Sequence, residues 1–145
     1  NLITMTDKFL IDDASRISGL TVTMIDYLCR ETIVVPTASR YRTKGKPRMY
    51  GYADVVMLRT VMFLLDKGGS VSRMKPALKS IRKRYPLSEM EELQDGFIVT
   101  NGVWAKFQNK NSTLQDVKFG EQFDVLHAVD IGKIHSYVGA AIKER

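Results

Sequence analysis

Residues 10–31 are predicted to form two short helices joined by a glycine turn, and this pattern constrains the fold more than any other part of the chain. Residues 12–18 are mostly small or charged and suit a first helix, and Gly19 supplies the turn. Thr21 has a side chain that can cap a second helix, which we expect to run to about Glu31. The order of these elements predicts a helix-turn-helix.

The second helix is predicted to have an apolar face and a polar face. Apolar residues at helical spacing should face the core, namely Leu20, Met24 or Ile25, and Leu28. The same geometry turns four residues outward, which are Val22, Thr23, Asp26 and Arg30. We expect these outward residues to meet the groove of a DNA duplex.

A segment rich in cations follows this helix. Residues 33–35 are β-branched and precede Pro36, so they suit one arm of a wing hairpin with Met49-Tyr50 as the returning arm. Five cations occur here without an intervening acid, namely Arg40, Arg42, Lys44, Lys46 and Arg48. The alternative is a solvated surface loop. Cations this close repel one another unless a polyanion neutralises them, which favours contact with DNA phosphates.

A third helix is predicted after the basic segment. Asp54 can cap it, and its apolar positions recur at helical spacing, namely Val55, Leu58, Met62 and Leu65. We expect it to end at Lys67, before Gly68-Gly69.

A fourth helix is predicted to open at Ser70 or Ser72 and to reach Ile81 or Arg84. Pro76 lies inside it, so we expect a kink there or a helix that starts near Pro76. Its end carries a second group of cations, namely Lys79, Arg82, Lys83 and Arg84. A solvated helix end explains that group as well as a second DNA contact does.

Beyond residue 86 the pattern changes to that of strands. Ser88 and Glu91 form a capping-box pattern, so residues 88–94 suit a short linking helix. Residues 97–100 and 103–107 flank Asn101-Gly102, which is typical of a two-residue type I′ hairpin turn. Residues 114–119 and 123–129 are further strand candidates. A closing helix is predicted by the spacing of Ile131, Ile134, Val138 and Ile142.

These patterns together predict an α+β fold with two domains. Residues 1–86 would form an N-terminal winged helix-turn-helix that binds DNA. Residues 87–145 would form a small strand-rich C-terminal domain with a closing helix, for dimerisation or partner binding.

The charge is segregated in the same way as the predicted domains. Residues 1–86 hold 16 Lys and Arg against 7 Asp and Glu, a net charge of +9, whereas residues 87–145 hold 6 against 9, a net charge of −3. The helix-turn-helix pattern lies in the basic half, which is the half suited to a nucleic acid.

The cysteine content, the hydropathy and the first residue indicate where in the cell the protein acts and where its natural sequence starts. The single cysteine, Cys29, excludes an internal disulfide and suits a small buried residue better than a redox or metal sensor. No apolar run approaches the roughly 20 residues that span a bilayer, and no signal pattern is present, so we expect a cytoplasmic protein. Because the sequence begins at Asn1 and not at Met, we expect a natural start upstream.

Neither a catalytic motif nor a metal site is predicted. The chain has no phosphate-cradling glycine loop with a lysine, no serine elbow and no HExxH pattern, so we expect no enzyme activity and no cofactor. His127 and His135 are eight residues apart without a second ligand at metal-binding spacing.

With these residues in view, residues 9–84 resemble the DNA-binding domain of the MerR family of bacterial transcription regulators. The resemblance depends on the order and spacing of short motifs, namely Ala14, residues 17–21, Tyr27, Pro36, residues 48–50, Asp54-Val55 and residues 65–70. It implies a winged helix-turn-helix that binds operator DNA as a dimer, with the second helix in the major groove and the wing on the flanking backbone.

The chain departs from the MerR pattern in two ways. Thr23 and Asp26 stand where family members often carry arginine. Asp26 can accept a hydrogen bond from a cytosine amino group, or it can pair with Arg30 four residues on. Pro86 and the hairpin replace the long dimerisation helix of the family, so dimerisation would use the C-terminal half.

The predicted sites follow from these expectations. Major-groove residues would be Thr21, Val22, Thr23, Tyr27 and Arg30, with Thr23 and Arg30 on base edges and Tyr27 on a phosphate. The five cations of residues 40–48 would contact the backbone or the minor groove. Dimer or partner contacts would come from Phe97, Val99, Trp104, Phe107, Ile134 and Val138.

We predict a sequence-specific transcription regulator, specifically a repressor that binds an inverted-repeat operator as a homodimer. Gly96, Asn101-Gly102 and residues 120–123 more weakly resemble the small domain of MerR-like antitoxins. The alternative is therefore an antitoxin that neutralises a toxin partner through residues 95–145 and autoregulates its operon. A third hypothesis is a DNA-bending factor of the phage excisionase type.

Overall fold

The computed structural model describes residues 8–38, 47–83, 96–108 and 127–144. In chain order the elements are β1 (Lys8–Phe9), α1 (Ile11–Ser18), α2 (Val22–Arg30), β2 (Tyr50–Gly51), α3 (Tyr52–Asp66), α4 (Val71–Lys83), β3 (Phe97–Thr100), β4 (Ala105–Gln108), β5 (His127–Asp130) and α6 (Ile131–Lys143). A helical N-terminal region therefore precedes a small sheet and a closing helix, which confirms the predicted α+β class.

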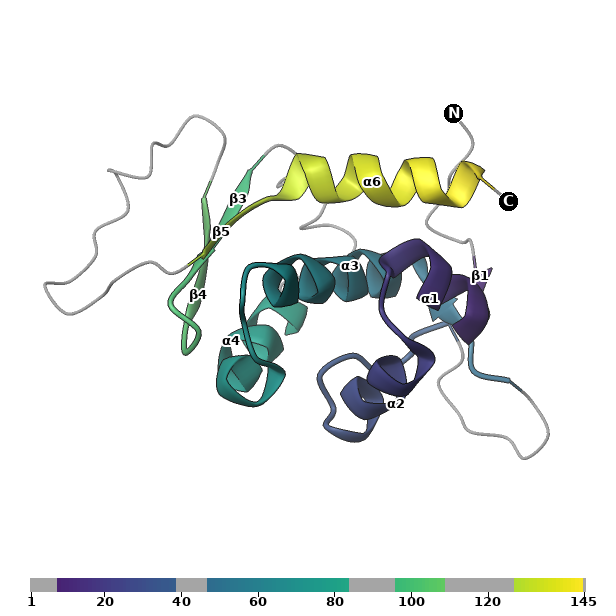
Figure 1. The fold of residues 1–145 in the computed structure, drawn as a ribbon, viewed down its shortest axis with the longest axis horizontal. Helices are drawn as coiled ribbons and strands as arrows, with labels where there is room; N and C mark the ends of the chain where they lie inside the picture. Colours follow the sequence, from purple (N-terminus) through teal and green to yellow (C-terminus); the bar gives the residue numbers. More distant parts are fainter. Residues whose placement is uncertain (1–7, 39–46, 84–95, 109–126, 145) are drawn as a thin grey trace, which may run out of the picture.

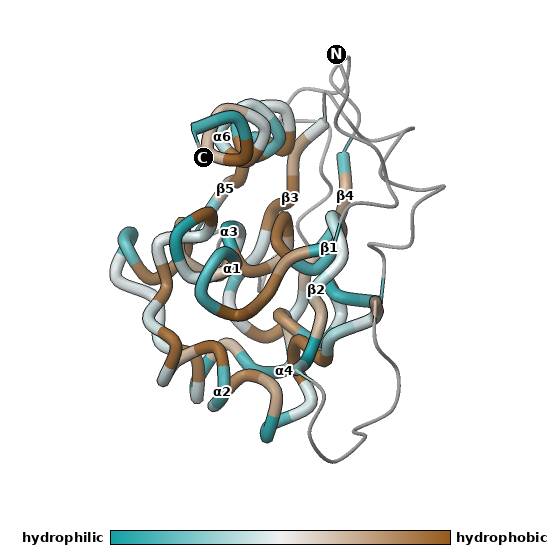
Figure 2. Tube along the Cα trace, turned by 90° about the vertical axis from the view of Figure 1, so that its right-hand side faces the viewer, coloured by the Kyte–Doolittle hydropathy of each residue, from teal (hydrophilic) through white to brown (hydrophobic). Residues whose placement is uncertain are grey.

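Helix α3 lies at the centre of the molecule (Figure 1). Helix α6 lies along α3 and α1 on one side, α2 lies on the opposite side, and the sheet of β3, β4 and β5 lies at one end. Figure 2, turned by 90°, also places α2 and α6 at opposite sides of α1 and α3. The outer surface of α2 therefore faces away from α6.

The predicted helix-turn-helix is confirmed in its local details. Gly19 ends α1 with φ +85°, and its N–H donates to the Ser15 carbonyl. The left-handed backbone at this position favours glycine, which has no Cβ. Thr21 Oγ1 accepts a hydrogen bond from the Met24 N–H at 3.0 Å, as the expected cap of α2 does.

The predicted wing hairpin is wrong in its strand pairing. Residues 33–35 form no strand; instead the N–H groups of Ile33 and Val34 both donate to the Leu28 carbonyl, at 2.9 and 3.2 Å. These amides therefore satisfy the Leu28 carbonyl near the end of α2 and are not available for hydrogen bonds within a sheet. The returning strand β2 pairs antiparallel with β1, with Phe9 opposite Tyr50.

Helix α3 begins earlier than predicted. It starts at Tyr52 with Gly51 as its N-cap, so Asp54 lies in the first turn and not at the cap position. The Asp54 carboxylate accepts from the Gly51 N–H at 2.7 Å, which satisfies a donor that the helix leaves free. The predicted end is confirmed, because α3 stops at Asp66 with Lys67 as its C-cap.

Helix α4 runs through Pro76. It begins at Val71, so the expectation that it starts near Pro76 is wrong. Proline has no backbone N–H, so the carbonyl four residues earlier, that of Ser72, lacks its usual helical hydrogen bond. Ser72 is exposed, so water can satisfy this carbonyl and the helix tolerates the proline.

The C-terminal hairpin is confirmed, but its turn differs from the prediction. Strands β3 and β4 pair with Thr100 opposite Ala105, so the loop has four residues. Among the described residues Thr32 is the single non-glycine residue with positive φ, which rules out a type I′ turn with Asn101 in that conformation. The side-chain Oδ1 of Asn101 instead accepts from the N–H groups of Val103 and Trp104, at 2.9 and 3.0 Å.

Strand β5 completes a three-stranded sheet in the order β4-β3-β5. It forms the described part of the predicted strand at residues 123–129. The predicted helix at residues 88–94 and the predicted strand at residues 114–119 lie outside the described residues.

The predicted closing helix is confirmed as α6, with Asp130 as its cap. Its four predicted apolar residues are buried, namely Ile131, Ile134, Val138 and Ile142. A single cluster of buried side chains includes these residues together with the core of α1, α2 and α3. The division of the chain at residue 86 stays a prediction.

No helix in the described part of the chain is long and apolar enough to cross a membrane.

Candidate nucleic-acid interface

Helix α2 presents the polar face that its sequence predicts. Ile25 and Leu28 are fully buried against the core. Thr21, Val22, Thr23 and Arg30 are exposed, and Asp26 and Tyr27 are half-buried. The structure therefore gathers the five predicted major-groove residues on or beside the outer surface of one helix.

Arg48 connects the basic segment to α2. Its Nη1 lies 3.7 Å from Oδ1 of Asp26, so Asp26 pairs with Arg48 and not with Arg30 as one interpretation of the sequence had it. Arg48 also lies beside the buried hydroxyl of Tyr50. Burial raises the pKa of Tyr50 to about 12, and the positive charge of Arg48 acts in the opposite direction.

A second ion pair connects the end of α2 to α4. Lys75 Nζ lies 2.7 Å from Oε1 of Glu31. The hydrogen bond and charge of Lys75 lower the pKa of Glu31, and the charges of Lys79 and Arg30 add to this effect. The same hydrogen bond raises the pKa of Lys75. Cations thus surround the C-terminal end of α2.

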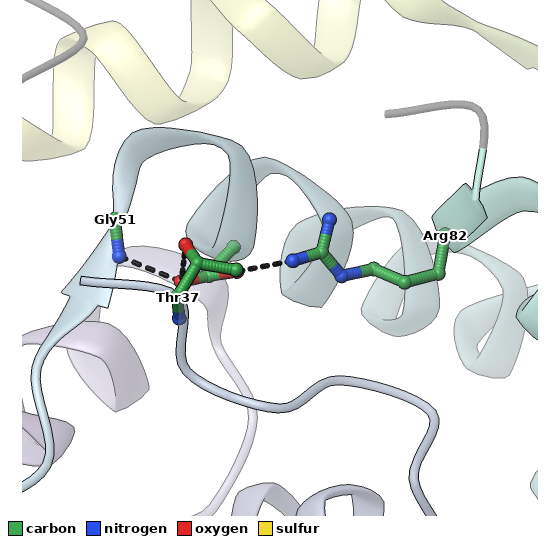
Figure 3. Close-up of polar contacts among 4 residues, drawn as sticks. Thr37, Gly51 and Arg82 are labelled. Carbon is green, nitrogen blue, oxygen red and sulfur yellow. Dashed lines mark hydrogen bonds and ion pairs between the residues drawn. The ribbon is translucent and has the colours of Figure 1, made fainter. Parts of the chain in front are cut away.

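Asp54 forms a buried polar cluster that sequence reasoning missed (Figure 3). Its Oδ2 accepts from the N–H and Oγ1 of Thr37, at 2.9 and 2.8 Å, and from the Gly51 N–H. Its Oδ1 lies 2.6 Å from Nη2 of Arg82 on α4. Because Thr37 and Gly51 lie on either side of the basic segment, this one carboxylate fixes both ends of it.

The two groups of cations differ in how far the structure describes them. Arg40, Arg42, Lys44 and Lys46 lie outside the described residues. In the second group, Arg82 is directed at Asp54, Lys79 is half-buried and Lys83 is exposed. Arg84 lies outside the described residues.

Residues 9–81 match the family described as MerR HTH family regulatory protein. The chain belongs to the MerR family. Residues 9–81 contain α1, α2, α3, most of α4, β2 and Phe9 of β1, so the family accounts for the helix-turn-helix and for most of the β1–β2 pair. Helix α6 and the sheet lie outside the match.

Three curated relatives are similar to the MerR region. They are uncharacterized HTH-type transcriptional regulators of Mycobacterium bovis and of two strains of Mycobacterium tuberculosis, CDC 1551 and H37Rv. Each is 34% identical over 71 residues, which is 49% of this chain and 32% of the relative. The match therefore spans about a third of each relative's length. Family and relatives are named as transcription regulators and not as enzymes, so the MerR region is that of a DNA-binding regulator.

The six predicted dimer or partner residues of this MerR protein lie at different depths. Val99, Ile134 and Val138 are buried within the chain, and Ile134 and Val138 pack α6 against the core. Phe97, Trp104 and Phe107 are half-buried on the hairpin. A partner contact by these residues stays a prediction.

The structure shows the surroundings of Cys29 and of His135. Cys29 is half-buried in α2. The Tyr52 hydroxyl lies 2.8 Å from Nδ1 of His135, which joins the start of α3 to α6. In residues 8–38, 47–83, 96–108 and 127–144, no three His, Cys, Asp or Glu side chains lie together as metal ligands would.

Proposed function

We propose that this MerR protein is a sequence-specific transcription regulator that binds an inverted-repeat operator as a homodimer and represses the adjoining gene. The observation that carries the proposal is the outer surface of α2. Val22, Thr23 and Arg30 are exposed there, and Arg48 of the basic segment lies against Asp26 of the same helix. A helix that is bordered by cations in this way fits the major groove of a polyanion.

Each group of residues has a separate role in this proposal. Arg30 and Thr23 contact base edges, since arginine matches guanine O6 and N7 and a threonine can bond a base or touch a thymine methyl group. Tyr27 contacts a phosphate, and Thr21 positions α2 by capping it. The basic segment (Arg40, Arg42, Lys44, Lys46 and Arg48) contacts the phosphate backbone and contributes affinity more than specificity.

The homodimer is proposed because a single short recognition helix reads few base pairs. Helix-turn-helix dimers read two half-sites about one helical turn apart, and the operator then has the two-fold symmetry of the protein. Repression is proposed because a dimer bound across a promoter occludes it without any further contact.

Selection of bound sequences from a random duplex library tests the proposal. The intact chain is used at near-physiological salt, because phosphate contacts make every affinity depend on salt. We expect enrichment of an inverted repeat with a fixed spacing. General binding that weakens with salt and enriches no sequence would contradict the proposal.

A substitution then tests the role of α2. Arg30→Ala should weaken binding to the selected site more than to random duplex, by about 1 to 3 kcal/mol if Arg30 bonds a guanine. Lys133→Ala is the control, because it removes one exposed cation from α6, on the side of the molecule opposite α2. Equal losses on both DNAs for Arg30→Ala would remove its specifying role.

A further inference from the structure

A carboxylate lies in the middle of the exposed face of α2. Asp26 follows Val22 by four residues and precedes Arg30 by four residues, so all three share one side of the helix. Thr23, three residues before Asp26, borders the same side. The Asp26 side chain is 44% exposed, so its oxygens reach the surface that the proposed function places against DNA.

Such a carboxylate opposes DNA binding unless a cation is close to it. Phosphates repel it, and in the major groove it would also repel the acceptor atoms of guanine and thymine. Arg48 supplies the cation at 3.7 Å and is itself only 21% exposed. The pair therefore places one negative charge on the recognition surface without a net repulsion from the backbone.

A carboxylate in this position can recognise one kind of base edge. An ionised carboxylate only accepts hydrogen bonds, and cytosine presents an amino donor in the major groove without an acceptor of its own. Adenine presents an amino group beside an acceptor, and guanine and thymine present acceptors. Rejection of wrong edges by repulsion contributes to specificity as much as the new bond does.

We propose that Asp26 is a specificity-determining residue that selects a cytosine in each half-site by accepting a hydrogen bond from its amino group, and that Arg48 is the positioning residue that holds the carboxylate for this contact. The inference rests on the proposed function. It gives a role to the position at which this chain departs from the arginine that family members often carry.

The chain offers a matched control for the charge. Asp13 on α1 pairs with Arg16 at the same 3.7 Å, and its side chain is 43% exposed. Asp13→Asn and Asp26→Asn therefore remove equal charges from carboxylates of similar exposure that lie at the same distance from an arginine. Asparagine also keeps the shape of aspartate, and unfolding in urea shows whether both variants fold as the wild type does.

The experiment is the library selection repeated with the wild type, Asp26→Asn and Asp13→Asn. We expect the wild type and Asp13→Asn to require cytosine at one position of each half-site. Asp26→Asn should move the preference at that position towards adenine, since asparagine pairs with adenine N6 and N7, and should lower the ratio of specific to random binding about 10-fold.

Arg48→Gln separates the proposal from a purely structural ion pair. The variant keeps the carboxylate but removes the cation that positions it, so we expect weaker binding to all DNA and also a weaker preference for cytosine. An unchanged preference would remove the positioning role of Arg48. The inference is overturned if Asp26→Asn enriches the same bases as the wild type at every position, even where its overall affinity changes. A wild type that enriches no sequence would overturn the proposed function itself, and the inference with it.

Discussion

The guanidinium of Arg59 lies over the ring of Tyr137, with 3.6 Å between the arginine Cζ and the ring centroid. Arg59 belongs to α3 and Tyr137 to α6, and Nη1 of Arg59 donates to the Ser18 carbonyl at 3.2 Å. Ser18 immediately precedes the glycine turn before α2. One side chain of α3 therefore connects the closing helix to the turn that orients the recognition helix.

Loss of the Tyr137 ring should weaken this connection. A cation over an aromatic ring contributes about 0.5 to 1 kcal/mol at exposed sites, and Tyr137 is 44% exposed. Tyr137→Leu should therefore lower the free energy of unfolding in urea by about 1 kcal/mol. Tyr137→Phe keeps the ring and serves as the control. Equal losses in the two variants would assign the effect to the hydroxyl and not to the ring.

The Asp54 cluster should contribute more to the free energy of unfolding than a surface ion pair does. Asp54 is fully buried and Arg82 is 19% exposed, so Asp54 has no access to water and Arg82 has little if its partner is removed. Breaking a buried pair costs about 3 to 5 kcal/mol, and we expect Asp54→Asn to cost about 3 kcal/mol given the partial exposure of Arg82. Urea unfolding measures this cost.

Asp12→Asn is the control for the Asp54 prediction. Asp12 is exposed in the first turn of α1, and its charge favours the helix N-terminus only slightly. We expect a loss below about 1 kcal/mol for this variant. A loss for Asp54→Asn as small as that for Asp12→Asn would mean that water reaches the cluster.

Thr32 stores backbone strain directly after the recognition helix. Its φ is +57°, a conformation that a β-branched residue rarely adopts. Its hydroxyl donates to the neighbouring Glu31 carbonyl at an exposed site, which offsets little of the strain. We expect Thr32→Gly to raise the free energy of unfolding by about 1 kcal/mol, which urea unfolding would show as a higher midpoint.

A glycine substitution at an ordinary helical position should instead lower the free energy of unfolding. Ala140→Gly, at an exposed site inside α6, should destabilise by about 1 kcal/mol. If Thr32→Gly also destabilises, the strain at Thr32 is smaller than the entropy that glycine loses on folding.

The sequence predicts those parts of the fold whose chemistry is local. Gly19 and Thr21 end one helix and cap the next through atoms within four residues of each other, so composition and spacing identify them. The hairpin at Asn101-Gly102 and the apolar spacing of α6 are likewise local. The ends of α1 and α2 follow from a few neighbouring residues. The type of the Asn101-Gly102 turn and the start of α3 differ from the prediction.

Partners that are distant in sequence are the parts that the sequence did not predict. Residues 33–35 have the composition of a strand, but the partner of β2 is β1, with Phe9 opposite Tyr50, and β1 is only two residues long and has no recognisable period. Asp54 is separated from Thr37 by 17 residues and from Arg82 by 28 residues. Such pairings depend on how the helices pack, and no pattern in one segment contains that information.

The contact between Tyr52 and His135 makes the attachment of α6 dependent on pH. Burial lowers the pKa of His135 below its ordinary value of 6.5, and Nε2 has no hydrogen-bond partner among the residues that the structure describes. A protonated ring would carry two N–H donors, and the buried Nε2–H would lack an acceptor. The folded state therefore favours the neutral ring.

The sign of the pH effect follows from this shift. As pH falls, the unfolded chain binds the proton first, so the contribution of His135 is complete above a pH of about 6.5 and is lost as pH falls below that value. The free energy of unfolding should therefore decrease more steeply between pH of about 7.5 and 5.5 for the wild type than for His135→Gln, which cannot titrate there. Because carboxylates contribute to acid unfolding in both proteins, the difference between the slopes is the measurement. Identical slopes for the wild type and His135→Gln would mean that the buried ring accepts its proton without loss and that α6 remains attached at either pH.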